Sequence, residues 1–422
     1  MIKKINLRSE FLKYTMVLMS GTVVAQLLSV LLSPVITRLY TPEEASELGL
    51  YMRIAAFGSA LATARYELSM PIMKADGHAF RIFRFALRIM FFALLASSLL
   101  ILIPIFYEDA RWDRLIFYGL IAVSIGLLAF FNLGTNWSLR MKKFKTITYA
   151  KMGNSIGANV SKILFGYMGV GYLGLIFGTV IGHIIGNLWF VKSFTQNLKK
   201  FKVKAVDTRT KLLAKEHIDF PTINLPHVLV DLGRDLLFAL ILLNAFGEEE
   251  FGLYDHSYRI LRLPLVFAGV AVGQVFFQRG AEMINKGQSV LPMMKRSVGL
   301  LAILSIIPFG LIFLYGEEMF GWVFGKEWSR AGAMSEILSF WLAINFMVSP
   351  LSSIPLVLRR QKEFFLLGSI GAVLMLIAVA IPAYVMKESI EFTLWVVSIT
   401  QAIYMTFLIF VTFYFAKLGR KS

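Results

Sequence analysis

Residues 364–386 read FFLLGSIGAVLMLIAVAIPAYVM, an apolar stretch without a charged side chain. The hydrocarbon core of a bilayer is ~30 Å thick, and a helix of about 20 residues crosses it. A strand of a membrane barrel would be about 10 residues long and would alternate in polarity. The stretch therefore predicts a transmembrane helix and indicates an integral membrane protein.

Similar stretches follow one another along the whole chain. Of its 422 residues, 57% are hydrophobic and 16% are charged, which excludes a disordered chain and most soluble folds. At about 20 residues for each span, the apolar content predicts about twelve helices in an all-α fold. The predicted spans are residues 14–37, 48–73, 85–107, 115–136, 147–169, 172–191, 222–246, 252–278, 298–316, 333–357, 364–386 and 392–415.

The basic residues fall on one side of these spans. The N-terminus, every second loop and the C-terminus hold 31 of the 43 Lys and Arg, whereas the opposite loops hold six. Since cytoplasmic loops are enriched in Lys and Arg, we expect both termini to be cytoplasmic. The net charge of +17 then reflects topology and does not indicate nucleic-acid binding. Lipid-binding patches are an alternative reading of the same loops.

Two halves of the chain share short motifs. Residues 47–51 read ELGLY, and residues 250–254 read EFGLY. The recurrence predicts two six-helix bundles of the same orientation, related by a pseudo-two-fold axis along the membrane normal. We expect residues 1–195 to form the first bundle, 196–220 a basic cytoplasmic linker, and 221–422 the second bundle.

Familiar catalytic and metal-binding patterns are absent from the sequence. It contains no Cys, and its five His are scattered. It has no phosphate-binding loop, no H-E-x-x-H and no G-x-S-x-G. We therefore expect no metal, no cofactor and no catalytic residue. Glycines at steps of four, from Gly174 to Gly186, predict a smooth helix face for close packing.

Charged side chains inside the predicted spans are the candidate site, because each costs at least about 2.5 kcal/mol in hydrocarbon unless it faces protein or water. The basic ones, which we expect to bind substrate, are Arg53, Arg65, Lys162, Arg234, Arg259 and Arg262. The acidic ones, candidates for ion pairs or for coupling, are Glu67, Asp231, Asp235 and Asp255. The excess of positive charge favours a path for an anion, since guanidinium groups grip phosphate with two hydrogen bonds.

The positions of these charges leave two readings open for the second half. Asp231, Arg234 and Asp235 share one helix face, and so do Asp255, Arg259 and Arg262, so each trio is either an internal ion-pair network or a substrate contact. In the first half, Arg53 and Arg65 would lie at two depths of one helix, separated by about 18 Å of rise.

Residues 20–26, 38–44, 49–51 and 65–68 resemble bacterial O-antigen and capsular polysaccharide flippases, the Wzx-like branch of the MATE-like exporter superfamily. Residues 45–47 depart from the family pattern, and we expect them to lengthen an outer loop. The resemblance implies a multi-pass protein of the bacterial inner membrane that is not an enzyme. It also implies alternating access that moves an undecaprenyl-diphosphate-linked oligosaccharide from the cytoplasmic to the periplasmic leaflet. Membrane lipids and polysaccharide polymerase machinery would be partners, and nucleic acid would not.

Three other functions remain open beside this resemblance. A membrane polymerase or ligase would be an enzyme of similar hydropathy, but it would usually have a large outer loop for its sugar chemistry, and no outer loop predicted here exceeds roughly 20 residues. A flippase for a lipid-linked peptidoglycan precursor would have nearly the same sequence features. A cation-coupled drug antiporter of the same fold would favour acidic residues in its cavity over an excess of arginine.

The predicted topology can be tested with reporter fusions. A reporter placed after Lys200 should signal the cytoplasm, and one placed after Glu249 should signal the periplasm, because one span separates the two positions. Fusions that both report the same side would show that the span assignment is wrong.

Overall fold

The computed structural model describes residues 7–107, 111–201, 207–265, 276, 279–280, 282–284, 286–349, 351, 354–358 and 360–419. Within these ranges every regular element is helical, and no strand occurs. The chain divides into two compact units. Unit 1 consists of Met1–Tyr40 and Leu48–Leu236, and unit 2 of Thr41–Glu47 and Leu237–Ser422. The division into bundles at residues 195 and 221 stays a prediction.

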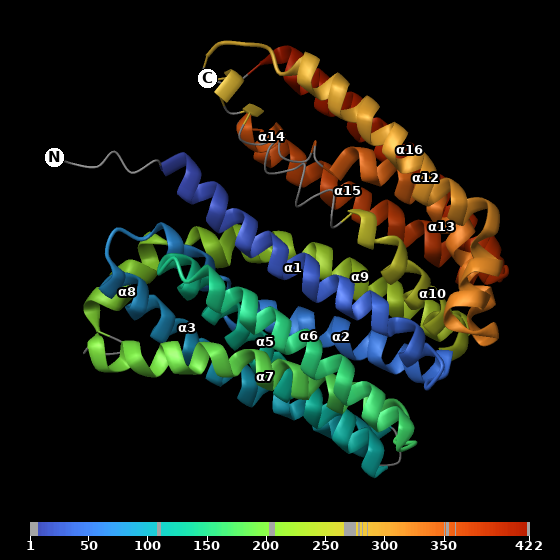
Figure 1. Ribbon diagram of the computed structural model, residues 1–422, viewed down its shortest axis with the longest axis horizontal. Helices are drawn as coiled ribbons and strands as arrows, with labels where there is room; N and C mark the ends of the chain where they lie inside the picture. The colour runs from blue at the N-terminus through green and yellow to red at the C-terminus, as the bar shows by residue number, and fades with distance from the viewer. Residues whose placement is uncertain are drawn as a thin grey trace. The chain divides into compact units, whose positions relative to one another are not determined.

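Unit 1 is a bundle of long helices (Figure 1). Its elements are α1 (Leu7–Thr37), α2 (Pro42–Ala62, from Leu48 on), η1 (Tyr66–Ile72), α3 (Asp76–Ser98), η2 (Leu99–Ile101), α4 (Leu102–Tyr107), α5 (Trp112–Arg140), α6 (Phe144–Tyr167), α7 (Tyr172–Lys200), α8 (Thr208–Glu216), η3 (Phe220–Asn224) and α9 (Leu225–Phe246, up to Leu236). α6 packs between α1 and α7, and α5 packs between α3 and α7. The short helix α8 packs against α3. Since α8 lies within the expected linker of residues 196–220, that linker is partly helical.

Unit 2 contains the remaining helices. They are α10 (Glu248–Leu261), α12 (Leu291–Phe324), η4 (Lys326–Trp328), α13 (Ser329–Val348), α14 (Ile354–Val357), α15 (Gln361–Ala380), η6 (Ile381–Met386) and α16 (Ile390–Leu418). α13 packs against α10, α12 and α16, and α15 packs against α16. At the closest approach of α12 and α13, a Cβ on Gly332 would lie 2.2 Å from the carbonyl oxygen of Gly316.

The start of α2 is set by local chemistry. The amide of Thr41 donates to Oε2 of Glu44 at 2.9 Å, and the amide of Glu44 donates to Oγ1 of Thr41 at 3.4 Å. This reciprocal pair is a capping box, and Pro42 suits the first helical position because it lacks a donor there. Residues 45–47 are therefore helical, and the expectation that they lengthen an outer loop is wrong.

The end of α2 also differs from the prediction. The helix stops at Ala62, and the next turn holds Ala64 and Arg65 in the left-handed region, with φ of 47° and 61°. A right-handed helix cannot continue through such residues, so the chain turns and resumes as η1. The prediction of one continuous span over residues 48–73 is wrong, because hydropathy does not report backbone direction.

The glycine face on α7 packs closely against α6, as the sequence predicts. A Cβ on Gly178 would lie 2.6 Å from Cγ of Lys162, and one on Gly182 would lie 2.6 Å from the carbonyl oxygen of Asn154. These distances leave no room for a side chain. The two helices therefore gain extensive van der Waals contact along their length, which is how helices associate inside a bilayer.

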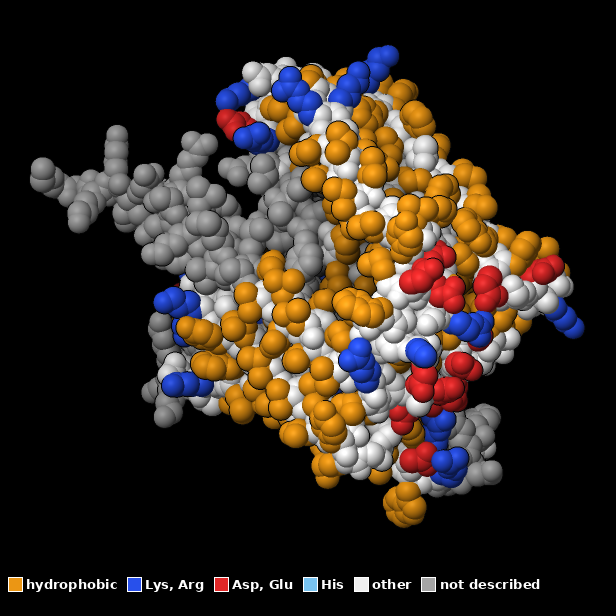
Figure 2. Space-filling view, turned by 45° about the vertical axis from the view of Figure 1, so that its right-hand side comes forward, with side chains coloured by type: hydrophobic (Ala, Val, Ile, Leu, Met, Phe, Trp, Pro, Cys, Tyr) orange, Lys and Arg blue, Asp and Glu red, His pale blue; other side chains and the backbone are white. Residues whose placement is uncertain are grey.

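Six described helices are long and apolar enough to cross a membrane: Trp112–Arg140, Tyr172–Leu198, Leu291–Phe324, Lys326–Val348, Lys362–Met386 and Ile390–Leu418. Figure 2 shows hydrophobic side chains over much of the visible surface, with charged side chains gathered in separate groups. On α12, for example, Ile307 is 68% exposed and Trp322 is 82% exposed. Exposure of such large apolar surfaces to water is unfavourable, whereas contact with the hydrocarbon of a bilayer is not.

Gly252 on α10 offers a test of packing within unit 2. A Cβ at this position would lie 1.8 Å from the carbonyl oxygen of Pro42, which is backbone and cannot rotate away. Gly252→Ala should therefore lower the melting temperature of the purified protein, at a cost of about 1–3 kcal/mol for overpacking. Gly310→Ala on α12 is the matched control, since no atom lies within 4 Å of its Cβ position. Equal melting temperatures for the two variants would contradict this packing.

Candidate functional site

Arg53 lies on the face of α2 opposite the packed core. Tyr51 faces α5, because its hydroxyl donates to the carbonyl of Leu120 at 2.8 Å, and a Cβ on Gly58 would lie 2.5 Å from Cδ1 of Ile125. At about 100° for each residue, Arg53 is rotated by about 200° from Tyr51 and so points away from α5. It is half-buried, and its Nη1 donates to the carbonyl of Gly49 at 3.0 Å.

The beginning of α9 runs beside α2 within unit 1. Nε of Arg65 donates to Oδ1 of Asn224 at 3.1 Å, and the ring of Phe57 lies 3.6 Å from the Cβ position of Gly233. The first contact joins residues 65 and 224, and the second joins residues 57 and 233. Residue numbers therefore fall along one segment while they rise along the other, so the two helices are antiparallel. Arg53 lies about 6 Å beyond Phe57 along the same face of α2, so it and Arg234 occupy neighbouring helices at similar levels.

Arg65 holds a buried acid. The Glu67 side chain is 1% exposed, and Nη1 of Arg65 lies 3.3 Å from its Oε1. Neither carboxylate oxygen accepts a hydrogen bond from a described residue. The pair is local, because Arg65 lies in the turn that follows α2 and Glu67 is in the first turn of η1. Arg65 is therefore not at a second depth of the helix that carries Arg53, and the predicted 18 Å separation along one axis does not apply.

The first predicted trio pairs internally. Nη2 of Arg234 donates to Oδ1 of Asp235 at 2.8 Å, and Nη1 lies 3.7 Å from Oδ1 of Asp231. All three side chains are at least one-quarter exposed. The network is thus accessible to water or to a ligand, and it holds the Arg234 guanidinium beside two carboxylates.

The second trio is only partly an ion-pair network. Asp255 is buried and accepts a hydrogen bond from Nη2 of Arg259, which is half-exposed. Arg262 instead lies over Tyr258, with its guanidinium carbon 5.3 Å from the ring centroid. Tyr258 in turn stacks on Trp341 of α13, with a centroid distance of 6.3 Å. Arg262 follows the last residue of α10, which accounts for its different surroundings.

Lys162 belongs to a polar stripe that the sequence interpretation did not identify. The stripe consists of Lys151, Ser155, Asn159 and Lys162, which lie at steps of four, four and three residues on one face of α6. This spacing inside an apolar span is the signal that was available in the sequence.

Three members of this stripe bind α1. Lys151 Nζ donates to Thr22 Oγ1 at 2.9 Å, Ser155 Oγ donates to the carbonyl of Ala25 at 2.7 Å, and Asn159 Nδ2 donates to Ser29 Oγ at 3.0 Å. Lys162 differs, because its Cγ lies against Gly178 of α7, and its main-chain carbonyl accepts a hydrogen bond from the Tyr40 hydroxyl at 2.7 Å. Lys151, Ser155 and Asn159 thus line the α1–α6 interface with donors and acceptors.

The chemistry of these groups is that of binding. Guanidinium and ammonium groups can hold an anion, and the polar stripe can exchange hydrogen bonds with hydroxyl groups. Among the described residues, no group of three His, Asp, Glu or Cys side chains is placed to hold a metal ion.

Comparison of the sequence with known families gives one match over most of the chain. The sequence profile of the family described as "Polysaccharide biosynthesis protein" matches residues 35–333. A search of curated protein sequences finds no significant match.

Solved structures share the fold. A multidrug resistance MATE family transporter of the MOP superfamily, in an inward-facing conformation, superimposes with a TM-score of 0.69 at 13% identity, covering 96% of this chain and 97% of the other. The lipid II flippase MurJ, in an inward closed conformation, gives 0.69 at 14% identity, covering 94% and 90%. A MOP superfamily transporter from Pyrococcus furiosus gives 0.59 at 13% identity, covering 96% and 94%. The expected MATE-like, all-α membrane fold is confirmed, and at these identities the likeness shows the fold alone.

The Arg65–Glu67 pair generates a stability test. Arg65→Gln should lower the melting temperature, because a buried carboxylate that loses its ion partner costs about 3 kcal/mol or more. Glu67→Gln in the same chain should restore most of the loss, since a neutral amide is less costly to bury. Arg111→Gln is the control, because Arg111 is 71% exposed and its ion pair with Asp113 lies at the surface, where such pairs contribute little to stability. Arg65→Gln with unchanged melting would show that the pair is not structural.

Proposed function

Because the chain belongs to the polysaccharide biosynthesis protein family, we propose that it is a flippase for a lipid-linked oligosaccharide. The substrate is an undecaprenyl-diphosphate-linked repeat unit, moved from the cytoplasmic to the periplasmic leaflet of a bacterial inner membrane. The product would serve O-antigen, capsule or exopolysaccharide synthesis. The observation that carries the proposal is the placement of Arg53 of α2 and Arg234 of α9 on neighbouring helices at similar levels, inside a chain of this family.

The arginines suit the charge of this substrate. A diphosphate that crossed hydrocarbon unaided would lose its hydration at great cost, and guanidinium groups replace part of that hydration with charge-assisted hydrogen bonds. Arg53 is half-buried and faces the α9 side of α2, at a level similar to that of Arg234. Arg65 and Lys162 add positive charge within unit 1. Arg259 and Arg262 supply it within unit 2.

Alternating access of two helical bundles would complete the cycle. The polyprenyl tail stays in the bilayer while the head group moves, so the protein has to shelter only the polar part. Glu67, Asp231, Asp235 and Asp255 compensate neighbouring arginines when no substrate is bound, and we propose that they exchange partners as it passes. The step breaks no covalent bond, so the proposal needs no catalytic residue, metal or cofactor.

Two alternatives belong to other substrate classes. A peptidoglycan precursor flippase would use the same diphosphate chemistry, and the likeness to MurJ concerns the fold alone. A drug antiporter carries organic cations and would favour acidic residues in its cavity. The charged residues predicted within spans are instead six basic and four acidic ones. The charge balance therefore favours an anionic substrate.

Transport by purified protein in liposomes separates these functions. Undecaprenyl-diphosphate oligosaccharides, a peptidoglycan precursor and an organic cation would be supplied in parallel, with accessibility of each head group at the far leaflet as the readout. We expect the oligosaccharide lipid to be translocated fastest. Faster movement of the peptidoglycan precursor, or ion-dependent cation movement alone, would overturn the proposal.

Arg53 is the substitution that tests the proposed site. Arg53→Ala should abolish translocation while the melting temperature stays near that of the unmodified protein, because the side chain points away from the packed core. Arg53→Lys should restore activity in part, since a point charge replaces a bidentate fork. Arg111→Ala is the control: Arg111 is 71% exposed and pairs with Asp113 at the start of α5. An active Arg53→Ala protein, or one inactive only through unfolding, would contradict the role.

A further inference from the structure

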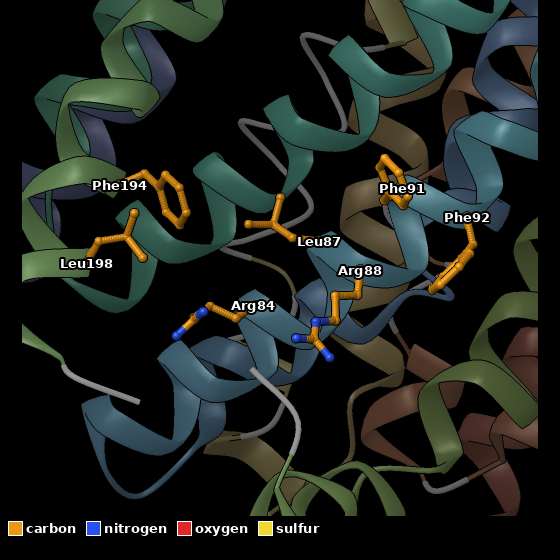
Figure 3. A pocket seen from close by; sticks show the side chains of 7 residues that line it. All are labelled: Arg84, Leu87, Arg88, Phe91, Phe92, Phe194 and Leu198. Carbon is orange, nitrogen blue, oxygen red and sulfur yellow. The ribbon is translucent and has the colours of Figure 1, made fainter. Parts of the chain in front are cut away.

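A cavity of about 500 Å³ opens on unit 1 between α3 and the end of α7. Figure 3 shows five side chains of α3 and two of α7 around the same hollow. Arg84 and Arg88 supply its charge, and the other lining residues, which include Phe194 and Leu198 of α7, are apolar. None of these residues belongs to the candidate site described above.

The cavity carries two positive charges without a carboxylate in its lining. Arg84 and Arg88 are separated by one turn of α3, about 6 Å of rise, so both lie on one face. Arg81, one turn earlier, forms an ion pair with Asp207 at the start of α8. Arg88 by contrast is exposed, and the structure gives it no ion pair with any described residue. The guanidinium group of Arg88 is therefore suited to a phosphate, and Arg84 adds a second positive charge one turn away in the same lining.

An apolar strip leads away from the arginines along α3. Phe92 is 67% exposed, Leu95 53% and Leu99 63%, at spacings that keep them on one side of the helix. Phe91, which also lines the cavity, is 58% exposed. A cationic pocket that continues into an apolar strip matches an amphiphile with a phosphate head and a hydrocarbon tail.

We propose that this cavity binds an anionic phospholipid of the surrounding membrane. Its phosphate lies between Arg84 and Arg88, and an acyl chain runs along the exposed strip of α3. The lining contains no hydroxyl, amide or carboxylate side chain that could bind sugar hydroxyls, which favours a simple phosphodiester head group over a glycosylated carrier lipid. Basic pockets at the ends of membrane helices bind such head groups through charge and hydrogen bonds.

Native mass spectrometry of the purified protein tests this site. The protein is titrated with phosphatidylglycerol and with phosphatidylethanolamine of identical acyl chains. We expect one phosphatidylglycerol molecule to bind about tenfold more tightly than phosphatidylethanolamine, and the R84Q/R88Q variant to lose that preference. The K295Q/R296Q variant is the matched control, because it removes two exposed neighbouring cations of α12 that do not line the cavity.

A second variant separates the cavity from its charge. Leu87→Trp fills the hollow and keeps both arginines, so it should also lose the tightly bound lipid. This variant and the comparison of the two lipids on the unmodified protein decide the question even if R84Q/R88Q does not fold. Equal binding of both lipids, or unchanged phosphatidylglycerol binding by both cavity variants, would overturn the proposal. Displacement of phosphatidylglycerol by equimolar undecaprenyl phosphate would also overturn it, by assigning the cavity to the carrier lipid.

Discussion

Hydrocarbon offers no hydrogen bonds, so every polar group inside a span has to find its partner within the protein. The α1–α6 interface meets this constraint with direct contacts, such as that from Lys151 Nζ to Thr22 at 2.9 Å. The buried Asp255 meets it through Arg259, one turn away on the same helix. Helix packing also has to come from the protein itself, and α6 and α7 approach closely through the glycines of α7.

The turn after α2 shows how this constraint shapes the site. Two residues in the left-handed region end the helix, and the chain then places Glu67 in the interior beside Arg65. The same guanidinium reaches Asn224 at the beginning of α9. One arginine thereby forms an ion pair with a buried acid and ties together two segments that are 159 residues apart in the chain. A break in an apolar stretch thus becomes a point of attachment between helices.

The basic side chains of unit 1 fall into separate groups with different surroundings. Arg65 and Arg234 have carboxylates beside them, and Arg53 is half-buried on the α9 side of α2, where it donates to a main-chain carbonyl. Arg84 and Arg88 lie in an apolar hollow next to an exposed hydrophobic strip. Arginine is suited to all these places because its charge persists on desolvation and its donors are spread over a planar fork. Charge alone therefore does not define a transport path, and the surroundings distinguish the roles.

The sequence by itself determined the class of fold and most helices, because apolar length and side-chain period are properties of neighbouring residues. It also placed Asp255 and Arg259 one turn apart, which left an ion pair and a substrate contact both open, and the structure shows the ion pair. Only the tertiary structure decided that α2 ends at Ala62, and that Asn159 meets Ser29 across 130 residues. Contacts between helices depend on which faces pack together, and no local period of the sequence contains that information.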